Sequence, residues 1–401
     1  MSDSLPTPAE VQSGRQADWR PRPADRRRWS SVAATAFHVA WRNLTGERRR
    51  WAVSTIALGI AAMLVIFLEG TARWVTSSGT AYLDHSGSHL VVAQTGVDDL
   101  LFAQSIFPMS TSTQVGQVNG VASAASIVGV NGVVSVGGAH LPVYLIGFQP
   151  GQAGGPWKMQ SGSGEPHGSE VVLDRGFARV AKVEVGQTVR LFGQDLKVVG
   201  TSAETDAAGD FFVFVPLEVA QKVAGEGAVS YSLVKVRDQS SAGQIASSIN
   251  QLPGVHALPR SEIAANDRAM MTTSFSQPVQ IVALVGLVAG ILITGIVLYT
   301  TTVEHSRDYA VLKAIGASGG VVYGSALLQA VVLSIGGILL GWGMATAMAF
   351  AFETWDPVVE AQLDADLVIS VAAVILVVNV LASLLPIRHV SRIDPQEVFK
   401  A

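Results

Sequence analysis

Four long apolar stretches without a charged residue constrain this sequence more than any other feature. They cover residues 51–68, 278–303, 314–352 and 367–387. A helix needs about 20 predominantly apolar residues to cross the roughly 30 Å hydrocarbon core of a bilayer, and one charge at its centre costs about 2.5–3.5 kcal/mol. Uncharged stretches of this length predict a membrane protein with four transmembrane helices.

The composition supports the same class of protein. Only 14% of the residues are charged and 49% are hydrophobic, whereas soluble proteins average about 25% charged residues. Cysteine is absent, which excludes disulfides, thiolate metal sites and cysteine nucleophiles. The net charge of −4 gives no argument for a nucleic-acid partner.

Two of the stretches permit a second interpretation. The third is longer than one span requires, and Gly336 and Gly337 lie in its middle. Because two spans of about 16 residues would be short for a bilayer, we expect one long helix over 319–352, tilted or bent. The first stretch could be a signal peptide, but the 50 largely polar residues before it favour an uncleaved helix over 51–72.

The charges on the connecting segments predict the orientation. The first 50 residues contain ten arginines and five acidic residues, and the tail after residue 387 contains Arg388, Arg392 and Lys400. The segment 353–366 contains five acidic residues and neither Lys nor Arg. The positive-inside rule therefore places both termini and the segment 304–318 in the cytoplasm, and the loop 353–366 outside.

The segment before the first span has a different character. Residues 1–30 are rich in Pro, Arg and Ser, which predicts a disordered tail. Residues 31–50 carry an apolar stripe at helical spacing that includes Phe37 and Trp41. We expect a helix that lies in the membrane interface; an ordinary amphipathic packing helix is the alternative.

Residues 73–277 lie between the first and second spans and predict a large extracytoplasmic α+β domain. The alternation around "FGQD", residues 192–195, indicates a β-hairpin, and "DRGFARVAKV" after residue 173 indicates a short helix. "SLVKVRD" followed by "SAGQIASSINQL" reads as a strand and then a helix. The β-rich part at 165–235 could form an inserted subdomain.

Motifs for several chemistries are missing or weak. No glycine precedes a lysine, so the phosphate-binding loop of ATPases is absent. "GASGG" at 316–320 fits the GxSxG pattern, but a membrane span follows it and a linker is the better interpretation. His85 and His89 lack a third metal ligand nearby, and Asp206 and Asp210 are better explained as a solvated turn than as an acid/base pair.

Two features within or beside the spans suggest helix packing and partner binding. The pairs Gly286/Gly290 and Gly337/Gly341 permit close helix contact, either within one subunit or between two. The segment 304–318, "EHSRDYAVLKAIGAS", predicts a short amphipathic helix that ends at Gly316. It is either a solvated connector or a helix that fills a groove on another protein.

The same fifteen residues resemble the signature of the FtsX-like permease domain. That domain occurs in ABC transporter permeases of the MacB, LolC/LolE, DevC and FtsX group. Further resemblance lies in "AWRNL" at 40–44, in "PIRHVSRIDPQEV" at 386–398, and in residues 170–200, which are similar to the MacB-type core domain. The resemblance covers roughly residues 31–401.

The resemblance implies a subunit of a larger machine in a bacterial inner membrane. Permeases of this group pair with a second permease copy or a paralogue and bind ATPase subunits, which hold ATP and Mg; no cofactor is expected on this chain. Residues 304–318 would be the coupling helix that contacts the ATPase. The residues that the resemblance assigns to it are Glu304, Arg307, Asp308, Tyr309, Leu312, Lys313 and Gly316. Asp308 stands where glutamate is commoner.

The expected function follows from the same resemblance. It is ATP-driven export or extraction of a lipid, lipopeptide, peptide or drug-like substrate, with a periplasmic adaptor as a further candidate partner. The alternative is an FtsX-like regulator that activates a cell-wall hydrolase outside the cell. A membrane-anchored enzyme is a third interpretation, but the sequence contains no nucleophile or metal constellation for it.

Overall fold

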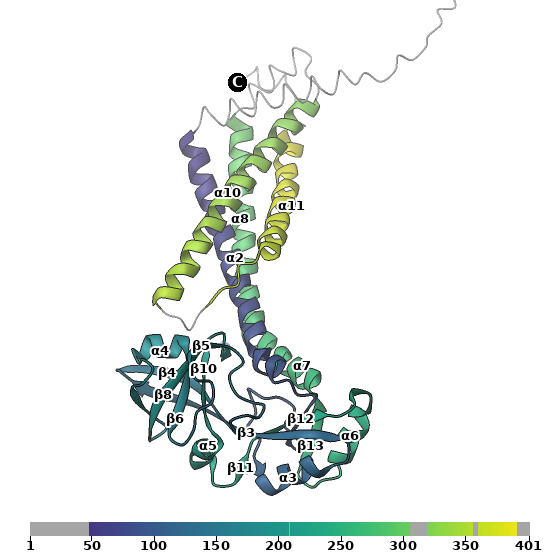
Figure 1. Ribbon diagram of the computed structural model, residues 1–401. Helices are drawn as coiled ribbons and strands as arrows, with labels where there is room; N and C mark the ends of the chain where they lie inside the picture. The colour runs from purple at the N-terminus through teal and green to yellow at the C-terminus, as the bar shows by residue number, and fades with distance from the viewer. Residues whose placement is uncertain (1–47, 208, 305–318, 356–359, 391–401) are drawn as a thin grey trace, which may run out of the picture.

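A computed structural model describes residues 48–207, 209–304, 319–355 and 360–390. Its two parts are a bundle of long helices and a folded domain of strands and short helices, here called the core domain, residues 86–259 (Figure 1). Four helices are long and apolar enough to cross a membrane. The predicted fold class, four membrane helices with a large α+β domain between the first and second, is confirmed.

Each of the four helices extends past its predicted limits. They are α2 (Arg48–His85), α8 (Gln277–Glu304), α10 (Gly319–Trp355) and α11 (Ala365–Val390). α10 is one uninterrupted helix, as expected for the third apolar stretch. The predicted disordered tail and residues 31–47 of the predicted interfacial helix, including Phe37 and Trp41, lie outside the described residues; residues 48–50 belong to α2.

The largest difference from the predicted limits concerns residues 73–85 and 260–276, which the sequence analysis places in the domain. α2 continues to His85, and α7 (Arg260–Met271) runs through a π-helical turn, η2 (Thr272–Ser276), into α8. The predicted second span begins at Pro278. A proline within a helix removes the hydrogen bond to the residue four positions back; this residue is Ser274, inside the π turn, where the helix adjusts to the loss.

The bundle packs around α2, which makes its most extensive helix contact with α10 and also contacts α8. Small residues permit this contact. A Cβ atom on Gly341 would lie 2.6 Å from the Ala62 Cβ and 2.7 Å from the Gly59 carbonyl oxygen, and one on Gly337 would lie 2.7 Å from Leu58. Gly286 and Gly290 meet the same helix at Leu64 and Ala61. Both glycine pairs thus face α2 within one chain.

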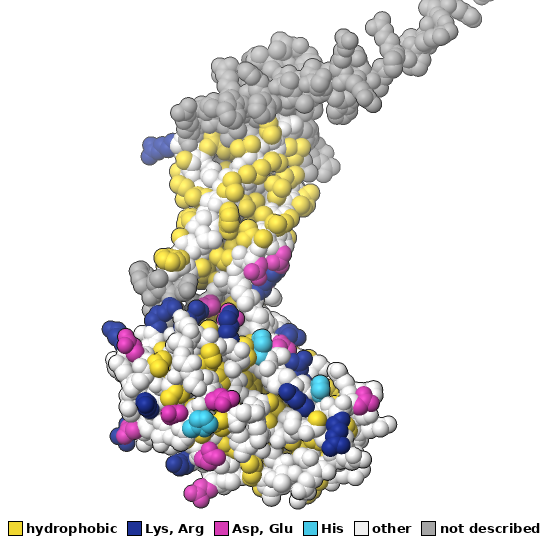
Figure 2. All heavy atoms as spheres, viewed as in Figure 1, with side chains coloured by type: hydrophobic (Ala, Val, Ile, Leu, Met, Phe, Trp, Pro, Cys, Tyr) yellow, Lys and Arg dark blue, Asp and Glu magenta, His cyan; other side chains and the backbone are white. Residues whose placement is uncertain are grey.

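The helical bundle and the core domain differ in the side chains that they expose (Figure 2). Hydrophobic side chains cover the visible face of the helical bundle, whereas Lys, Arg, Asp, Glu and His side chains are spread over the core domain. On α8, side chains such as Ile281, Val285 and Ile296 are each 63% exposed. Such exposed apolar side chains suit contact with lipid tails or a second membrane subunit.

The core domain is built on an 11-stranded sheet with two lobes joined by one long strand. The order along the sheet is β13-β1-β12-β3-β4-β10-β6-β8-β5, with β7 beside β8 and β9 beside β10. Residues 121–127 of β3 (Val121–Val136) pair with β12, and residues 128–136 pair with β4. The first lobe contains β13, β1 and β12, and the second contains β4, β10, β6, β8, β7 and β5.

The bounds of the remaining strands and helices complete the domain. The strands are β1 (Leu90–Gln94), β2 (Phe107–Pro108), β4 (Ala139–Phe148), β5 (Met159–Gly162), β6 (Glu170–Asp174), β7 (Thr188–Leu191), β8 (Gln194–Ser202), β9 (Asp206–Ala207), β10 (Asp210–Pro216), β11 (Ala228–Val229), β12 (Tyr231–Val236) and β13 (Val255–Pro259). The helices are α3 (Met109–Gln117), α4 (Arg175–Ala181), α5 (Leu217–Ala224), η1 (Gln239–Ser241) and α6 (Ala242–Ile249).

Local sequence signals in this domain predict its elements correctly. The hairpin of β7 and β8 turns between Leu191 and Gln194, and α4 and α6 form where short helices were expected. The expected inserted subdomain at 165–235 is wrong in its limits. The second lobe begins within β3, and β12 belongs to the first lobe, because these strands pair with partners distant in sequence.

We expect Gly341→Ala to destabilise the bundle. The added methyl group would overlap the α2 backbone, and overpacking of this kind costs about 1–3 kcal/mol. Gly343→Ala is the matched control on the same helix, since nothing lies within 4 Å of the position that its added Cβ would take. Thermal unfolding in detergent measures both; equal midpoints for the two variants would contradict close packing at Gly341.

Candidate functional site: the stalk between membrane helices and core domain

Two helices connect the membrane bundle to the core domain, and together they form the stalk: residues 72–85 of α2 and residues 260–276 of α7 and η2. They pack directly on each other. Gly79 leaves room for the Met271 side chain, whose Cε lies 2.8 Å from the position of an added Cβ. Trp74, Val75 and Met271 form a small buried cluster at this contact. Side-chain packing therefore joins the two helices along the stalk.

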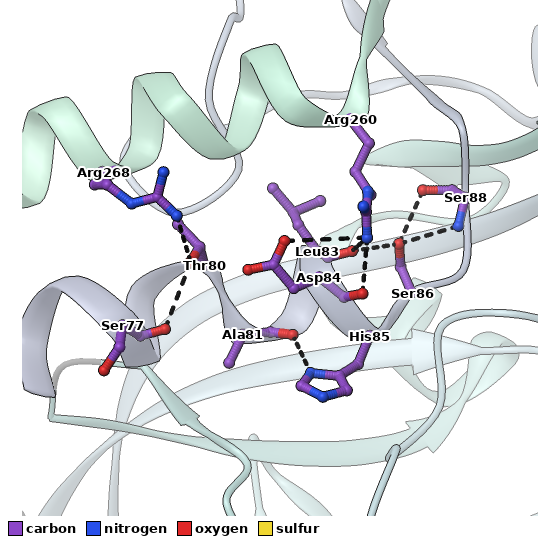
Figure 3. Close-up of polar contacts among 10 residues, drawn as sticks. All are labelled: Ser77, Thr80, Ala81, Leu83, Asp84, His85, Ser86, Ser88, Arg260 and Arg268. Atoms are coloured by element: carbon purple, nitrogen blue, oxygen red, sulfur yellow. Dashed lines mark hydrogen bonds and ion pairs between the residues drawn. The ribbon is translucent and has the colours of Figure 1, made fainter.

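The C-terminal end of α2 is capped by an arginine from the other stalk helix (Figure 3). Arg260 Nη1 donates to the carbonyl oxygens of Asp84 at 2.7 Å and Leu83 at 3.2 Å, and lies 4.0 Å from the Asp84 carboxylate. The last carbonyls of a helix have no partner within it and carry partial negative charge. The Arg260 guanidinium gives these carbonyls hydrogen-bond donors and a compensating positive charge. It thereby joins the first residue of α7 to the last turn of α2.

A second polar contact lies further along the stalk. Arg268 Nη2 donates to Thr80 Oγ1 at 3.4 Å, and Thr80 Oγ1 is in turn 3.5 Å from the Ser77 carbonyl (Figure 3). Nearer the membrane, Ser276 Oγ is 3.5 Å from the Ala72 carbonyl. These contacts are long and individually weak, but they keep the same faces of the two helices together over the whole stalk.

The α2 half of the stalk is anchored in the core domain by aromatic packing. The Tyr82 hydroxyl donates to the Gly154 carbonyl at 3.0 Å, and its ring meets Phe212 edge to face. The His85 ring stacks on Trp157 with centroids 5.2 Å apart, while His85 Nδ1 donates to the Ala81 carbonyl. Burial raises the pKa of Tyr82 above its ordinary value, so it remains a neutral hydrogen-bond donor.

The α7 half is anchored by a buried carboxyl group. Asp267 is fully buried, and its Oδ1 accepts hydrogen bonds from the backbone of Leu100 at 3.0 Å and Leu101 at 3.3 Å. Its Oδ2 is buried without a hydrogen-bond partner. Burial, helped by the charge of Asp99, raises the pKa of Asp267 to about 7, although the two backbone hydrogen bonds lower it.

The segment that Asp267 holds lies at the junction of the two lobes. Tyr144 from β4 donates to the Leu100 carbonyl at 3.0 Å, and Tyr231 from β12 donates to the carbonyls of Asp99 and Ala103, each at 3.0 Å. Tyr144 belongs to the second lobe and Tyr231 to the first. One loop thus joins α7 to both lobes of the core domain.

The base of the stalk is also tied to the start of α11. Arg73 Nη1 lies 2.7 Å from Asp366 Oδ2, and the Gln362 backbone donates to the Gly70 carbonyl at 3.1 Å. On the side of the core domain, Arg175 Nη2 lies 3.9 Å from Glu360 Oε1. The segment 360–366 thus contacts both the stalk and the core domain.

The sequence-predicted site residues are only partly within the described chain. Glu304 is the last residue of α8 and is exposed. The other predicted coupling residues, Arg307, Asp308, Tyr309, Leu312, Lys313 and Gly316, lie outside the described residues. His89 Nδ1 accepts a hydrogen bond from the Val236 backbone, and no group of three His, Asp or Glu side chains suited to a metal occurs within the described ranges.

The interpretation of Asp206 and Asp210 as a solvated turn is wrong for Asp206. Asp206 forms the short strand β9, which pairs with β10, and its Oδ2 is buried without a partner. Burial, followed by the charges of Asp174 and Glu360, raises the pKa of Asp206 to about 7. The turn between the two strands places one carboxyl group inside the domain instead of in solvent.

Sequence reasoning missed the stalk residues that carry these contacts. Trp74, Val75, Tyr82 and Leu83 repeat at helical spacing beyond the first span, as do Ile263, Ala264, Asp267 and Met271 before the second; all eight are buried. This spacing was the available signal for helices that continue out of the membrane. Nothing in the sequence indicated which carbonyls Arg260 would meet.

Comparison with known proteins identifies the family. Residues 51–252 match the family model of the MacB-like periplasmic core domain, and residues 280–395 match that of the FtsX-like permease C-terminal domain. The chain belongs to this family of ABC transporter permeases. The sequence-based prediction of the family is confirmed.

The permease has relatives over nearly its whole length. It is 25% identical to an uncharacterised ABC transporter permease of Mycobacterium tuberculosis (strain ATCC 25618 / H37Rv) over 90% of this chain and 98% of that protein. It is 24% identical to the pyoverdine export ATP-binding/permease protein PvdT of Pseudomonas syringae pv. tomato, over 92% of this chain and 59% of that protein. The periplasmic region of MacB from Actinobacillus actinomycetemcomitans matches 45% of this chain with 14% identity and a TM-score of 0.35.

We expect Asp267 to make the stability of the permease depend on pH. Its pKa rises from 3.8 to about 7 on folding, so between these values the native state binds more protons than the unfolded state. The free energy of unfolding should therefore fall as pH rises from 5 to 7.5, by about 2 kcal/mol for this group. Asp206 acts in the same direction.

Asp267→Asn should reduce this fall, because the amide cannot ionise and its oxygen can still accept from Leu100 and Leu101. The loss of stability is measured in detergent as the difference between the thermal midpoints at pH 5.5 and 7.5, followed by tryptophan fluorescence. Asp195→Asn, at an exposed position in β8, is the matched control and should behave as the wild type. A variant with the full wild-type fall would contradict the assignment to Asp267.

Proposed function

We propose that this permease is the membrane subunit of an ATP-driven transporter, and that its stalk transmits work from a separate ATPase subunit to the core domain. The observation that carries the proposal is the continuity of the first two membrane helices into the stalk, closed by Arg260 and anchored by Asp267. A tilt or twist of α2 and α8 in the membrane would then displace the stalk helices, which are built into the domain.

The ATPase would contact the segment 304–318. Membership of the family supports an ATPase partner, and the PvdT relative combines an ATP-binding and a permease function in its name. In this chain the phosphate-binding loop pattern is absent, so ATP and Mg would be held by the partner. A second permease copy or paralogue would complete the membrane part, and a periplasmic adaptor would contact the core domain.

The orientation in the proposal has both termini in the cytoplasm of a bacterial cell and the core domain outside the inner membrane. The arginine-rich first 50 residues support it. The substrate class is an exported or extracted lipid, lipopeptide, peptide or drug-like molecule. The match of residues 51–252 to a MacB-like core domain favours transport over the alternative of a hydrolase regulator.

Leu312→Asp or Arg307→Glu should abolish stimulation of the partner ATPase. A charged residue on the apolar edge of the coupling helix, or a reversed charge beside it, removes the complementarity of a groove contact. ATP turnover of the reconstituted complex measures the effect, with Arg190→Glu in the exposed part of β7 as the matched control. Unchanged turnover in both coupling variants, with normal membrane insertion, would contradict the coupling role.

Single cysteines test the orientation, because the natural chain has none. Lys313→Cys should be protected from a membrane-impermeant maleimide in intact cells and labelled only after the cells are opened. Asp195→Cys in the core domain should be labelled in intact cells. Labelling of both positions under the same condition would refute an arrangement with the coupling segment and the core domain on opposite sides.

A further inference from the structure

A polar cavity of about 240 Å³ lies at the junction of the two lobes of the core domain. Residues 102–105, in the loop between β1 and β2, form one wall. The other wall comes from β3, β4 and β12, and β3 is the strand that runs from one lobe into the other (Figure 1). The volume lies below the roughly 300–1,000 Å³ of sites for drug-sized ligands, so the cavity suits a single small ring.

The loop that forms the first wall is fixed by hydrogen bonds within the protein. Asp99 Oδ1 accepts from the backbone of Phe102 at 2.9 Å and from that of Ala103 at 2.6 Å. Ser105 Oγ accepts from the Gln94 backbone at 2.8 Å. A wall that is already ordered loses little conformational entropy when a ligand binds. The cavity is therefore a preformed site.

The lining of the cavity is polar but uncharged. The lining residues that the structure describes include no Lys, Arg, His, Asp or Glu. Asp99 and Asp267, which hold the loop, both direct Oδ1 at backbone amides of the loop. Burial of an ion without a partner of opposite charge costs free energy, so the cavity favours a neutral ligand over an ionic one.

Two side-chain amides in the lining offer hydrogen bonds to a ligand. Gln104 is exposed, and its amide has no hydrogen-bond partner among the described residues. Asn131 Nδ2 donates to the Leu101 carbonyl at 3.2 Å, which holds this amide in place, and its Oδ1 has no partner in the described chain. A side-chain amide donates through its nitrogen and accepts through its oxygen. An amide group on a ligand can therefore pair with Gln104 through both of its polar atoms.

A hydroxyl group and an aromatic ring complete the lining. The Tyr144 hydroxyl donates to the Leu100 carbonyl, and its oxygen can still accept. A Cβ on Gly129 would overlap this hydroxyl, so glycine keeps the space beside it open. Phe102 is 39% exposed, although its ring is apolar. A sugar ring matches this combination, because its hydroxyl groups project from the edge and its C–H faces are apolar.

A peptide matches the cavity less well. Extended peptides gain most of their hydrogen bonds from the unpaired backbone at the edge of a sheet. The strands β3, β4 and β12 are interior strands, and each has a neighbour on both sides. The cavity therefore offers side chains from two walls instead of a row of backbone groups.

We propose that this cavity binds a neutral sugar unit that carries an acetamido group. The acetamido group would pair with the Gln104 amide, a ring hydroxyl would donate to Tyr144 Oη, and the apolar face of the ring would pack on Phe102. Asp267 of the stalk holds the same loop, so the sugar would bind beside the contact that joins the membrane helices to the core domain. The proposal concerns the core domain alone and does not depend on a partner ATPase.

The test uses the full chain in phospholipid nanodiscs without nucleotide, because sugar-based detergents would compete for the cavity. Isothermal titration calorimetry measures the binding of triacetylchitotriose and of a trialanine peptide with both ends blocked. We expect saturable binding of the sugar with a Kd below about 1 mM, and binding of the peptide that is at least about tenfold weaker. Absence of sugar binding in this range, or a peptide that binds as tightly as the sugar, would overturn the proposal.

Variants of the loop test whether the sugar binds in this cavity. Phe102→Ala and Gln104→Ala should each raise the Kd by about fivefold or more, since each removes one contact with the ligand. Ile106→Ala is the matched control, because Ile106 is 42% exposed in the same loop and lies outside the described lining of the cavity. All three side chains are exposed, so the variants should fold, and equal thermal midpoints check this. Wild-type affinity in both cavity variants, or an equal loss in the control, would contradict the proposed site.

Discussion

The continuity of two helices from the membrane into the core domain is the constraint on which the rest of this structure depends. A helix satisfies its backbone hydrogen bonds within itself, so α2 can leave the membrane and enter the domain without a break in its backbone hydrogen bonding. The connection from α7 into α8 is helical as well, but its hydrogen-bond pattern changes at the π turn of Thr272–Ser276, beside Pro278. Any bending between membrane and domain is most easily accommodated at that turn.

Different kinds of interaction hold the helices in the membrane bundle and at the core domain. Within the membrane, close contact of Gly337 and Gly341 with α2 depends on shape alone. At the domain, Arg260 closes the free carbonyls of α2 and Asp267 holds the loop shared by both lobes. Packing fixes the helices where water is absent, and charged or buried polar groups fix them where the chain meets water.

The sequence analysis predicted the features that depend on local sequence. Uncharged stretches identified the membrane helices, and alternation around residues 192–195 identified the hairpin, because these signals lie within one element. It missed the stalk because long, charge-free apolar sequence was the criterion for a helix: the first stretch ends at Glu69, and the largely polar residues 272–277 and the charges of Asp267 and Arg268 precede the second. The pairing of β12 with β3 joins residues far apart in the chain and has no local signal.

The candidate site was predictable only in part for the same reason. Amphipathic spacing could have revealed that Ile263 and Asp267 share a helix face, but not that Asp267 meets the backbone of Leu100. The predicted coupling residues after Glu304 rest on the family resemblance and lie outside the described residues. The stalk, in contrast, rests on contacts that the structure contains.

Hydrogen exchange at the amides of Leu100 and Leu101 tests the central claim most directly, because both bond to Asp267 on the stalk. In the complex with its ATPase, a non-hydrolysable ATP analogue should change their exchange rates by roughly threefold or more. A chain with Thr272–Ser276 replaced by a flexible glycine–serine segment should bind the ATPase but lose this response. Identical exchange with and without nucleotide in the natural chain would contradict transmission through the stalk.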